Sequence, residues 1–187
     1  MKATPLQSAL ALACVVLASC ATQPEAQKIP VSSSIHPKSS VSTRIFDDVN
    51  GYRASKGAKK LQRHAGLDRL AQEHCEYLRQ HRGTFSLNGR NVSHIGFDGR
   101  ALLARERYQM ASLSENVAAS THPQGGASQA MIDLWKGSKD HHKNMLDEWQ
   151  FTGVGAVVDS DGTVFSTQIF ANPGTSGMLT RTRFNSF

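Results

Sequence analysis

Apolar residues recur every three to four positions in two stretches near the start of the folded part of the chain. The first stretch consists of Ile45, Phe46, Val49 and Tyr52. This spacing predicts a helix that ends at Ser55 to Gly57. In the second stretch, from Leu67 to Leu78, apolar side chains share one helical face and charged residues occupy the other. We therefore expect two amphipathic helices, each packed on a core through one face.

The middle of the chain carries shorter patterns. Residues 83–99 are rich in Gly, Asn and Ser, which is typical of a loop. We expect a short helix over residues 100–108 and a strand or a turn over residues 114–119. Apolar residues from Ala127 to Trp135 predict a further helix that ends near Gly137.

Two strand patterns follow towards the C-terminus. Residues 154–158 and 164–170 are rich in β-branched and aromatic side chains, as strands are. The sequence Asp159-Ser160-Asp161-Gly162 separates them, and an Asp-Gly pair in this place favours a hairpin. Helices followed by a C-terminal hairpin predict the α+β class, with helices packed on a small antiparallel sheet.

Length, composition and charge narrow the choice of function. The chain has 187 residues, 39% hydrophobic and 19% charged, unlike a disordered acidic chain or a coiled coil, and it suits a single domain. Lys and Arg number 21 against 15 Asp and Glu, which gives a net charge of +6. The basic residues are scattered, with no aromatic stacking platform among them, so we expect no nucleic-acid partner.

The first twenty residues carry a targeting signal. Lys2 precedes a mostly apolar stretch over residues 6–18, as in a secretory leader. Leu17-Ala18-Ser19-Cys20 then resembles the bacterial lipoprotein box. The resemblance implies cleavage before Cys20, attachment of acyl chains such as palmitate to this residue, and anchoring to the extracytoplasmic side of the bacterial cell envelope. Ala21, where Asp would favour the inner membrane, points to the outer membrane of a Gram-negative host.

The remaining chain divides into a tether, a domain and a tail. Residues 21–42 hold three prolines and six serines but few large apolar side chains, which is typical of a tether. We predict a signal peptide at 1–19, the lipidated Cys20 with its tether at 20–42, one domain at 43–172 and a tail at 173–187. Once Cys14 leaves with the leader and Cys20 is acylated, only Cys75 remains. This thiol is expected to be a buried, unreactive group on a helix face.

Two histidines and one glutamate are candidates for chemistry. His94 lies in a polar stretch, and Glu115 stands at the start of the expected strand at 114–119. His141 follows Asp140, which is a suitable N-cap for a short helix. A helix N-terminus disfavours imidazolium, so His141 is expected to be neutral, the form that ligates a metal. Spacing alone does not bring these residues into one site, and a histidine in such a position is more often a hydrogen-bonded structural residue than a metal ligand.

Several short motifs occur in a distinctive order along the domain. They are Val49-Asn50-x-x-Arg53, Ser93-His94, Ser114-Glu115-Asn116-Val117-Ala118, Trp135-x-x-Ser138-x-x-His141-x-x-Asn144-Met145-Leu146, Gly153-Val154-Gly155-Ala156 and Gln168-Ile169-Phe170-Ala171. In this order they resemble the CAP superfamily (cysteine-rich secretory, antigen-five and pathogenesis-related proteins), also called the SCP domain, in its compact bacterial branch. The resemblance implies an α-β-α sandwich with a three-stranded antiparallel sheet flanked by helices.

The resemblance also implies a central cleft that binds a ligand. Its expected residues are His94, Glu115, Asn116, Ser138 and His141. The two histidines take the family's histidine positions, where they would hold Zn weakly, and Glu115 takes the first acidic position. The second acidic position is occupied by Ser138, so one carboxylate of the family's pattern is missing. The neighbouring His142 competes with His141 for the second histidine position.

Two functions follow from this cleft. The first is a monomeric binding module for a lipid, a sterol-like molecule or an envelope glycan, with the membrane as partner through the N-terminal lipid. The alternative is a metal-assisted hydrolase of envelope peptide or lipid, in which Glu115 would deprotonate a water. The missing acidic partner removes a second proton carrier, which favours binding over catalysis. A third interpretation is an interaction protein whose His–Glu cluster only stabilises the fold.

Overall fold

The computed structural model describes residues 41–84, 94–121 and 123–174. The expected leader, the lipidation site at Cys20, most of the tether and the tail from residue 175 lie outside these residues. The helices are α1 (Val41–Ser55), α2 (Ala65–Gln80), α3 (Phe97–Tyr108), α4 (Ala127–Gly137) and α5 (Lys139–Leu146). The strands are β1 (Gln62–Arg63), β2 (Met110–Ser120), β3 (Phe151–Val158) and β4 (Val164–Pro173).

The expected elements are present, with shifted bounds. Helix α1 begins at Val41, two residues before the expected domain start, and α3 begins at Phe97, inside the stretch expected to be loop. The segment expected to be a strand or a turn is a strand, and β2 begins four residues before it and ends one residue after it. These extensions lack a clear apolar period in the sequence, because all of their residues except Ser42 and Met110 are exposed or only half-buried.

The sheet has four strands in the order β1-β3-β4-β2, not the three that the sequence led us to expect. Strands β3, β4 and β2 are antiparallel neighbours, and this part matches the expectation. The additional strand, β1, has only two residues and lies parallel to β3. Backbone hydrogen bonds of 2.9 Å from Gln62 to Gln150 and from His64 to Thr152 hold it there. A two-residue strand is too short to produce an alternating pattern.

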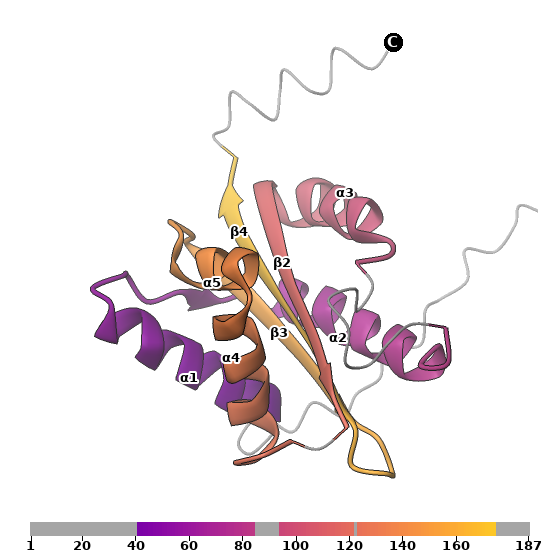
Figure 1. Ribbon diagram of the computed structural model, residues 1–187. Coiled ribbons are helices and arrows are strands. Elements are labelled where there is room, and N and C mark those ends of the chain that lie inside the picture. The colour runs from indigo at the N-terminus through magenta and orange to yellow at the C-terminus, as the bar shows by residue number, and fades with distance from the viewer. Residues whose placement is uncertain (1–40, 85–93, 122, 175–187) are drawn as a thin grey trace, which may run out of the picture. The chain divides into compact units, whose positions relative to one another are not determined.

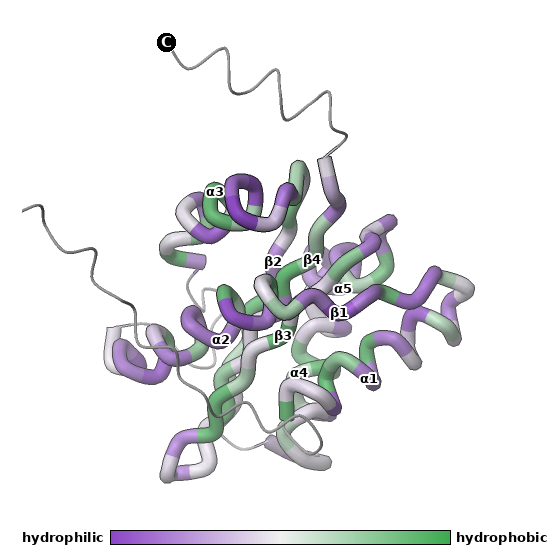
Figure 2. The backbone as a smooth tube through the Cα atoms, turned by 180° about the vertical axis from the view of Figure 1, so that it is seen from behind, coloured by the Kyte–Doolittle hydropathy of each residue, from purple (hydrophilic) through white to green (hydrophobic). Residues whose placement is uncertain are grey.

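Helices cover both faces of the sheet, which makes the α-β-α sandwich (Figure 1). On one face, apolar side chains of α1, α4 and α5 pack on the sheet around Trp135 and Phe170, both fully buried. On the other face, α2 packs along β3 and β4, with Leu67 and Ile169 at the centre. The shorter α3 lies beside β2, away from α1 and α4 (Figure 2).

Glycines in β3 allow α2 to pack directly on the strand backbone. A Cβ atom on Gly153 would overlap the backbone of Leu67, and one on Gly155 would overlap the backbone of Ala71. At this close approach, Asp68 and Gln72 of α2 accept hydrogen bonds of 2.8 and 3.0 Å from the backbone N–H groups of Val154 and Ala156. The Gly-Val-Gly-Ala motif therefore has a packing role, and the helix satisfies strand donors that the short β1 does not reach.

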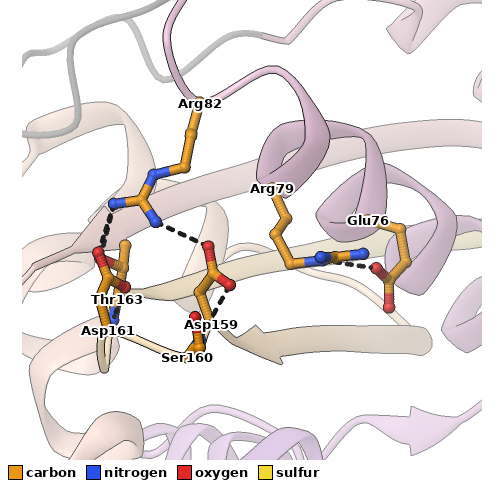
Figure 3. A network of polar contacts seen from close by, with 7 residues as sticks. All are labelled: Glu76, Arg79, Arg82, Asp159, Ser160, Asp161 and Thr163. Atoms are coloured by element: carbon orange, nitrogen blue, oxygen red, sulfur yellow. Dashed lines mark hydrogen bonds and ion pairs between the residues drawn. The ribbon is translucent and has the colours of Figure 1, made fainter.

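The predicted hairpin joins β3 to β4. Val158 pairs with Val164 across it, and Gly162 adopts a positive φ of 83°, a conformation that favours glycine. Arg82, just beyond the end of α2, inserts between two carboxylates of the turn (Figure 3). Its Nη1 lies 2.7 Å from Asp159 and its Nη2 lies 2.7 Å from Asp161. The ion pairs link α2 to the turn.

Cys75 is fully buried on α2, as expected. Burial raises the pKa of its thiol to about 12, although Thr167 opposes the shift by hydrogen bonding. The thiol therefore stays protonated and unreactive at neutral pH. In the part of the chain that the structure describes, none of the helices combines the length and the apolar character needed to span a bilayer.

Candidate functional site

The candidate site lies at the open edge of the sheet, where β2 is the last strand. Glu115 on β2 is at its centre, with a side chain that is 1% exposed. Arg100 on α3 donates to both of its oxygens, from Nε to Oε2 at 2.7 Å and from Nη2 to Oε1 at 2.8 Å. This two-point pairing of a planar guanidinium with a carboxylate is the strong form of an ion pair.

His94 contacts the same carboxylate from the solvent side. Its Nδ1 lies 2.9 Å from Oε1 of Glu115, and about half of its side chain, 48%, is exposed. Because an ionised carboxylate only accepts hydrogen bonds, Nδ1 carries the proton and Nε2 keeps its lone pair in the neutral ring. Burial alone would raise the pKa of Glu115, but hydrogen bonds from His94 and Arg100 and the charge of Arg100 outweigh it and lower the pKa.

His74 completes the surroundings of Arg100. The guanidinium places Nη1 3.1 Å from Nδ1 of His74 and 2.9 Å from the carbonyl oxygen of Ile95. A guanidinium has no acceptor, so Nδ1 of His74 accepts this hydrogen bond and the proton of the neutral ring is on Nε2. Helix α2, through the buried His74, thus holds Arg100 in position from the side opposite Glu115.

His141 reaches the site from the other layer of the molecule, on α5. Its ring centroid lies 6.2 Å from that of His94. Burial and the nearby His94 lower the pKa of His141 against the opposing charge of Asp140, so the ring is neutral at pH 7. Asn116 fixes this position, because its Nδ2 donates to the His141 carbonyl at 3.0 Å and its Oδ1 accepts from Asn144 at 3.0 Å.

The start of α5 differs from the expectation. Ser138, not Asp140, is the N-cap: its extended backbone precedes the helix and its hydroxyl accepts from the His141 N–H at 3.5 Å. The expectation was wrong because it began the helix two residues late. Asp140 instead lies in the first turn, where its negative charge interacts favourably with the positive end of the helix dipole.

The structure also separates the two neighbouring histidines. His142 points to α1, where its Nε2 lies 2.7 Å from the Tyr52 hydroxyl. Only His141 approaches His94. The structure therefore brings together His94, Glu115 and His141, supported by Asn116. The Ser138 hydroxyl caps α5 by accepting from the His141 N–H, and this hydrogen bond does not link it to the side chains of the group.

An apolar groove of about 440 Å³ adjoins the site between α3 and β2. Its apolar lining comes from Phe97, Ala101, Leu102, Met110, Ala111 and Leu113, and the charged side chains of Asp98 and Arg105 complete it. The Phe97 N–H donates to the His94 carbonyl at 3.0 Å, so the first residue of the groove lies one turn of chain after His94. Polar and apolar features thus lie next to each other along β2.

Comparison with known proteins identifies the family. The sequence pattern of the cysteine-rich secretory protein family, CAP, matches residues 46–170, which make up most of the domain. The chain belongs to the CAP family. The resemblance inferred from the sequence motifs is thereby confirmed. A search of curated proteins gave no match.

Several solved structures share this fold. An extracellular protein with an SCP domain from Bacillus anthracis is 25% identical with a TM-score of 0.54, and the alignment covers 71% of this chain and 40% of that one. An outer surface protein of Borrelia burgdorferi is 14% identical with a TM-score of 0.54, covering 70% and 90%. A cysteine-rich secretory protein of Staphylococcus aureus is 16% identical with a TM-score of 0.53, covering 74% and 40%. The chain thus spans two-fifths of the Bacillus and Staphylococcus proteins.

Two residues of this CAP domain's site were missed in the sequence analysis. Arg100 and His74 form the inner part of the site, yet Arg100 was counted among scattered basic residues and His74 among the residues of a helix face. One signal was available. A carboxylate expected on a buried strand needs a cationic partner, and in the structure this partner is Arg100.

The donors of this CAP domain do not fit a catalytic zinc site. Such a site takes three protein ligands, and no three His, Cys, Asp or Glu side chains among the described residues are grouped to hold a metal ion. Two imidazoles on a tetrahedral zinc, with Zn–N bonds of about 2.1 Å, would have centroids roughly 5 Å apart. The 6.2 Å between His94 and His141 is wider than that. Glu115 is meanwhile occupied by Arg100.

Proposed function

We propose that this CAP domain is an extracytoplasmic binding module for an amphiphilic ligand, a lipid or a sterol-like molecule, and not an enzyme. The observation that carries the proposal is the pairing of Glu115 with Arg100. Both carboxylate oxygens accept from the guanidinium, and the side chain is 1% exposed. A general base needs a free oxygen within reach of a water or substrate proton. Both oxygens of Glu115 already accept hydrogen bonds and are shielded from water, so we infer that Glu115 orients His94 and does not act as a base.

The polar part of the ligand would contact the two histidines. His94 offers Nε2 as an acceptor on the exposed side of its ring, and the neutral His141 offers an acceptor and a donor. A hydroxyl or a protonated carboxyl group can donate to one ring and accept from the other. The cleft thus suits the single polar group at the end of an amphiphile.

The apolar part of the ligand would lie in the groove between α3 and β2. Six of the eight lining residues are apolar, and apolar pockets with a few polar groups at one end are typical of small-molecule sites. This lining favours a lipid or a sterol-like molecule over an envelope glycan, because a glycan needs polar partners along its whole length. The groove volume of about 440 Å³ is within the usual range for such ligands.

The cellular location of the protein is part of the same proposal. The lipoprotein box at Cys20 supports anchoring to the cell envelope, and the Bacillus relative is described as extracellular and the Borrelia relative as an outer surface protein. A module held at a membrane meets amphiphiles at high local concentration. We propose the same location for this chain.

The test is binding of a fluorescent fatty acid by the full chain, with displacement by unlabelled fatty acids and sterols. Ala101→Phe should lower the affinity by about tenfold or more, because the added ring fills the groove. Leu103→Phe is the matched control, since it adds a ring on the same helix outside the lining and should leave the affinity unchanged.

Equal binding by both variants and the parent would contradict the proposal. The competing hydrolase is tested on the same samples: turnover of envelope peptide or lipid that is lost with a chelator and with Glu115→Gln would establish it. The same samples test zinc. Calorimetry at about pH 7.5 should show at most weak binding, lost in the His94→Ala, His141→Ala double variant.

A further inference from the structure

The described part of the chain ends beside the apolar groove between α3 and β2. Pro173, the last residue of β4, pairs with Met110, the first residue of β2. The end of β4, the start of β2 and helix α3 lie together at one end of the sheet (Figure 1). Since Met110 also lines the groove, the chain that follows β4 begins at the edge of the groove.

A backbone hydrogen bond holds the chain at this point. The Gly174 N–H donates to the carbonyl of Gln109, the C-cap of α3, at 2.9 Å. Gln109 has a positive φ of 59°, and among the described residues it is the only one other than glycine that does. This left-handed conformation ends α3 and turns the chain directly into β2. Gly174 is thus fixed at the end of the helix whose side chains form one wall of the groove.

The sequence after β4 changes character at Thr180. From Gly174 to Thr180 it reads Gly-Thr-Ser-Gly-Met-Leu-Thr and carries no charge, and Arg181 is the first basic residue. The small residues that come first are typical of a linker. Met178 and Leu179 then form an adjacent apolar pair, and burial of this pair against the domain would remove it from water.

The linker has the length that the groove requires. Phe97 and Arg105 mark the extent of the lining on α3, which is about 12 Å along the helix at about 1.5 Å per residue. Met178 and Leu179 follow Gly174 by four and five residues, and an extended chain of that length spans about 13–18 Å. The apolar pair can therefore reach every part of the lining.

Charge does not select the occupant of the groove. Among the exposed side chains of α3, Asp98 and Glu106 balance Arg105 and Arg107, so the helix favours neither an anionic nor a cationic partner. An uncharged segment can be buried there without leaving an ion unpaired. The phenylalanines further along the tail suit the groove less well, because two arginines precede them.

We propose that Met178 and Leu179, from the tail of the same chain, occupy the groove between α3 and β2. They would cover Leu102, which lines the groove but is 43% exposed. A short linker gives a tethered segment an effective concentration in the mM range, so even a weak contact fills the groove. A separate protein at micromolar concentration would need to bind about a thousandfold more tightly to compete equally.

A segment that occupies the groove competes with a ligand for the same space. The apparent affinity for the ligand then falls in proportion to the fraction of molecules whose groove is empty. The ligand enters only by displacing Met178 and Leu179, so the tail sets a threshold concentration for binding. This regulation rests on the proposed function, whereas the occupation of the groove by the tail does not.

Disulfide trapping in the full chain tests the contact. Cys14→Ser and Cys20→Ser leave only the buried Cys75, which does not react at neutral pH. Thr180→Cys then places a thiol next to the apolar pair, and Ala101→Cys places a second thiol in the groove lining. A disulfide forms only where the two Cα atoms come within about 7 Å of each other. The rate of its formation in a buffer of oxidised glutathione is followed by mass spectrometry.

The matched control is Leu103→Cys, on the same helix but outside the groove lining. Position 103 is the more exposed of the two, so accessibility alone would favour it. Position 101 should nevertheless react with position 180 about tenfold faster, and adding Met178→Ser and Leu179→Ser should abolish the difference. Equal rates at 101 and 103, or a disulfide that joins two separate chains, would overturn the proposal. If Ala101→Cys fails to fold by circular dichroism, Leu102→Cys takes its place.

Binding of the fluorescent fatty acid separates this inference from the proposed function. The variant Met178→Ser, Leu179→Ser should bind it about twofold or more tightly than the parent, because its groove is no longer occupied. Phe184→Ser, further along the tail, is the control and should bind like the parent. Trapping with unchanged affinity would retain the contact and reject the competition. If neither the variant nor the parent binds the fatty acid, the proposed ligand is rejected, and the trapping rates still decide whether the tail occupies the groove.

Discussion

At the scale of the residue, the site depends on one buried ion pair. Glu115 is held by Arg100, which is itself held by His74, so a single carboxylate joins residues from β2, α3 and α2. The Arg100 side chain is 10% exposed and that of Glu115 is 1% exposed. Neither charge has enough water around it to do without its partner.

Replacing Arg100 should destabilise the domain strongly. Arg100→Met leaves the Glu115 carboxylate buried without a counter-charge, which costs about 3–5 kcal/mol of unfolding free energy. Arg105→Met, on the exposed side of the same helix, is the control and should change the free energy by less than about 0.5 kcal/mol. Urea unfolding measures both.

The double variant Arg100→Met, Glu115→Gln separates charge from packing. Since it removes both charges, it should recover most of the stability that Arg100→Met loses. A single variant that unfolds like the control would show that Glu115 does not depend on Arg100.

At the scale of the element, α2 packs directly against the backbone of β3. The two glycines of β3 leave room for the helix backbone and nothing more. Overpacking at such a contact cannot be relieved by a rotamer change, because the atoms opposite the glycine belong to the main chain.

Gly155→Ala should therefore cost about 3 kcal/mol of unfolding free energy, the upper end of the usual range for overpacking. The matched control is Gly51→Ala on α1, where a Cβ meets nothing within 4 Å and φ is not positive. In that helix, alanine should add about 0.5–1 kcal/mol to the free energy of unfolding. Urea unfolding of the two variants beside the parent tests the prediction. Destabilisation by both would place the effect outside this contact.

The sequence predicted elements that have their own pattern and missed features that need the assembled fold. The amphipathic α2 and the Asp159–Gly162 turn were predicted because periodicity and turn chemistry are local. The two-residue β1 and the pairing of Arg100 with Glu115 were not, since each depends on residues far apart in the chain. The family resemblance predicted that His94 and His141 lie in one cleft. Their spacing along the chain did not predict this.

At the scale of the whole molecule, depressed pKa values make stability depend on pH. The pKa of His141 is lowered in the folded state by burial and by His94, so the unfolded chain binds its proton more readily. Its contribution is complete above the unfolded pKa of about 6.5 and is lost as the pH falls below it. The carboxyls of Glu115 and Asp161 also have lowered pKa values, and their contributions begin to be lost as the pH falls below the ordinary values of about 4.5 and 3.8.

The melting temperature of the domain should therefore fall between about pH 7.5 and 5.5, before any carboxyl is protonated. One histidine can contribute at most about 1.4 kcal/mol per pH unit to this loss. Scanning calorimetry of the parent and His141→Gln measures it. The variant should show a flatter profile in this range and the same acid limb below about pH 4.5. Parallel profiles would assign the dependence to other groups.

The ion pairs of Arg82 have a consequence for how such proteins diversify. Arg82 is bound to the β3–β4 turn (Figure 3). His94 is bound to Glu115, so the chain is fixed at both of these residues. Doubling the length of a connection between fixed ends costs only about 0.6 kcal/mol. A change in chain length between Arg82 and His94 should therefore cost little stability and leave both of these contacts in place.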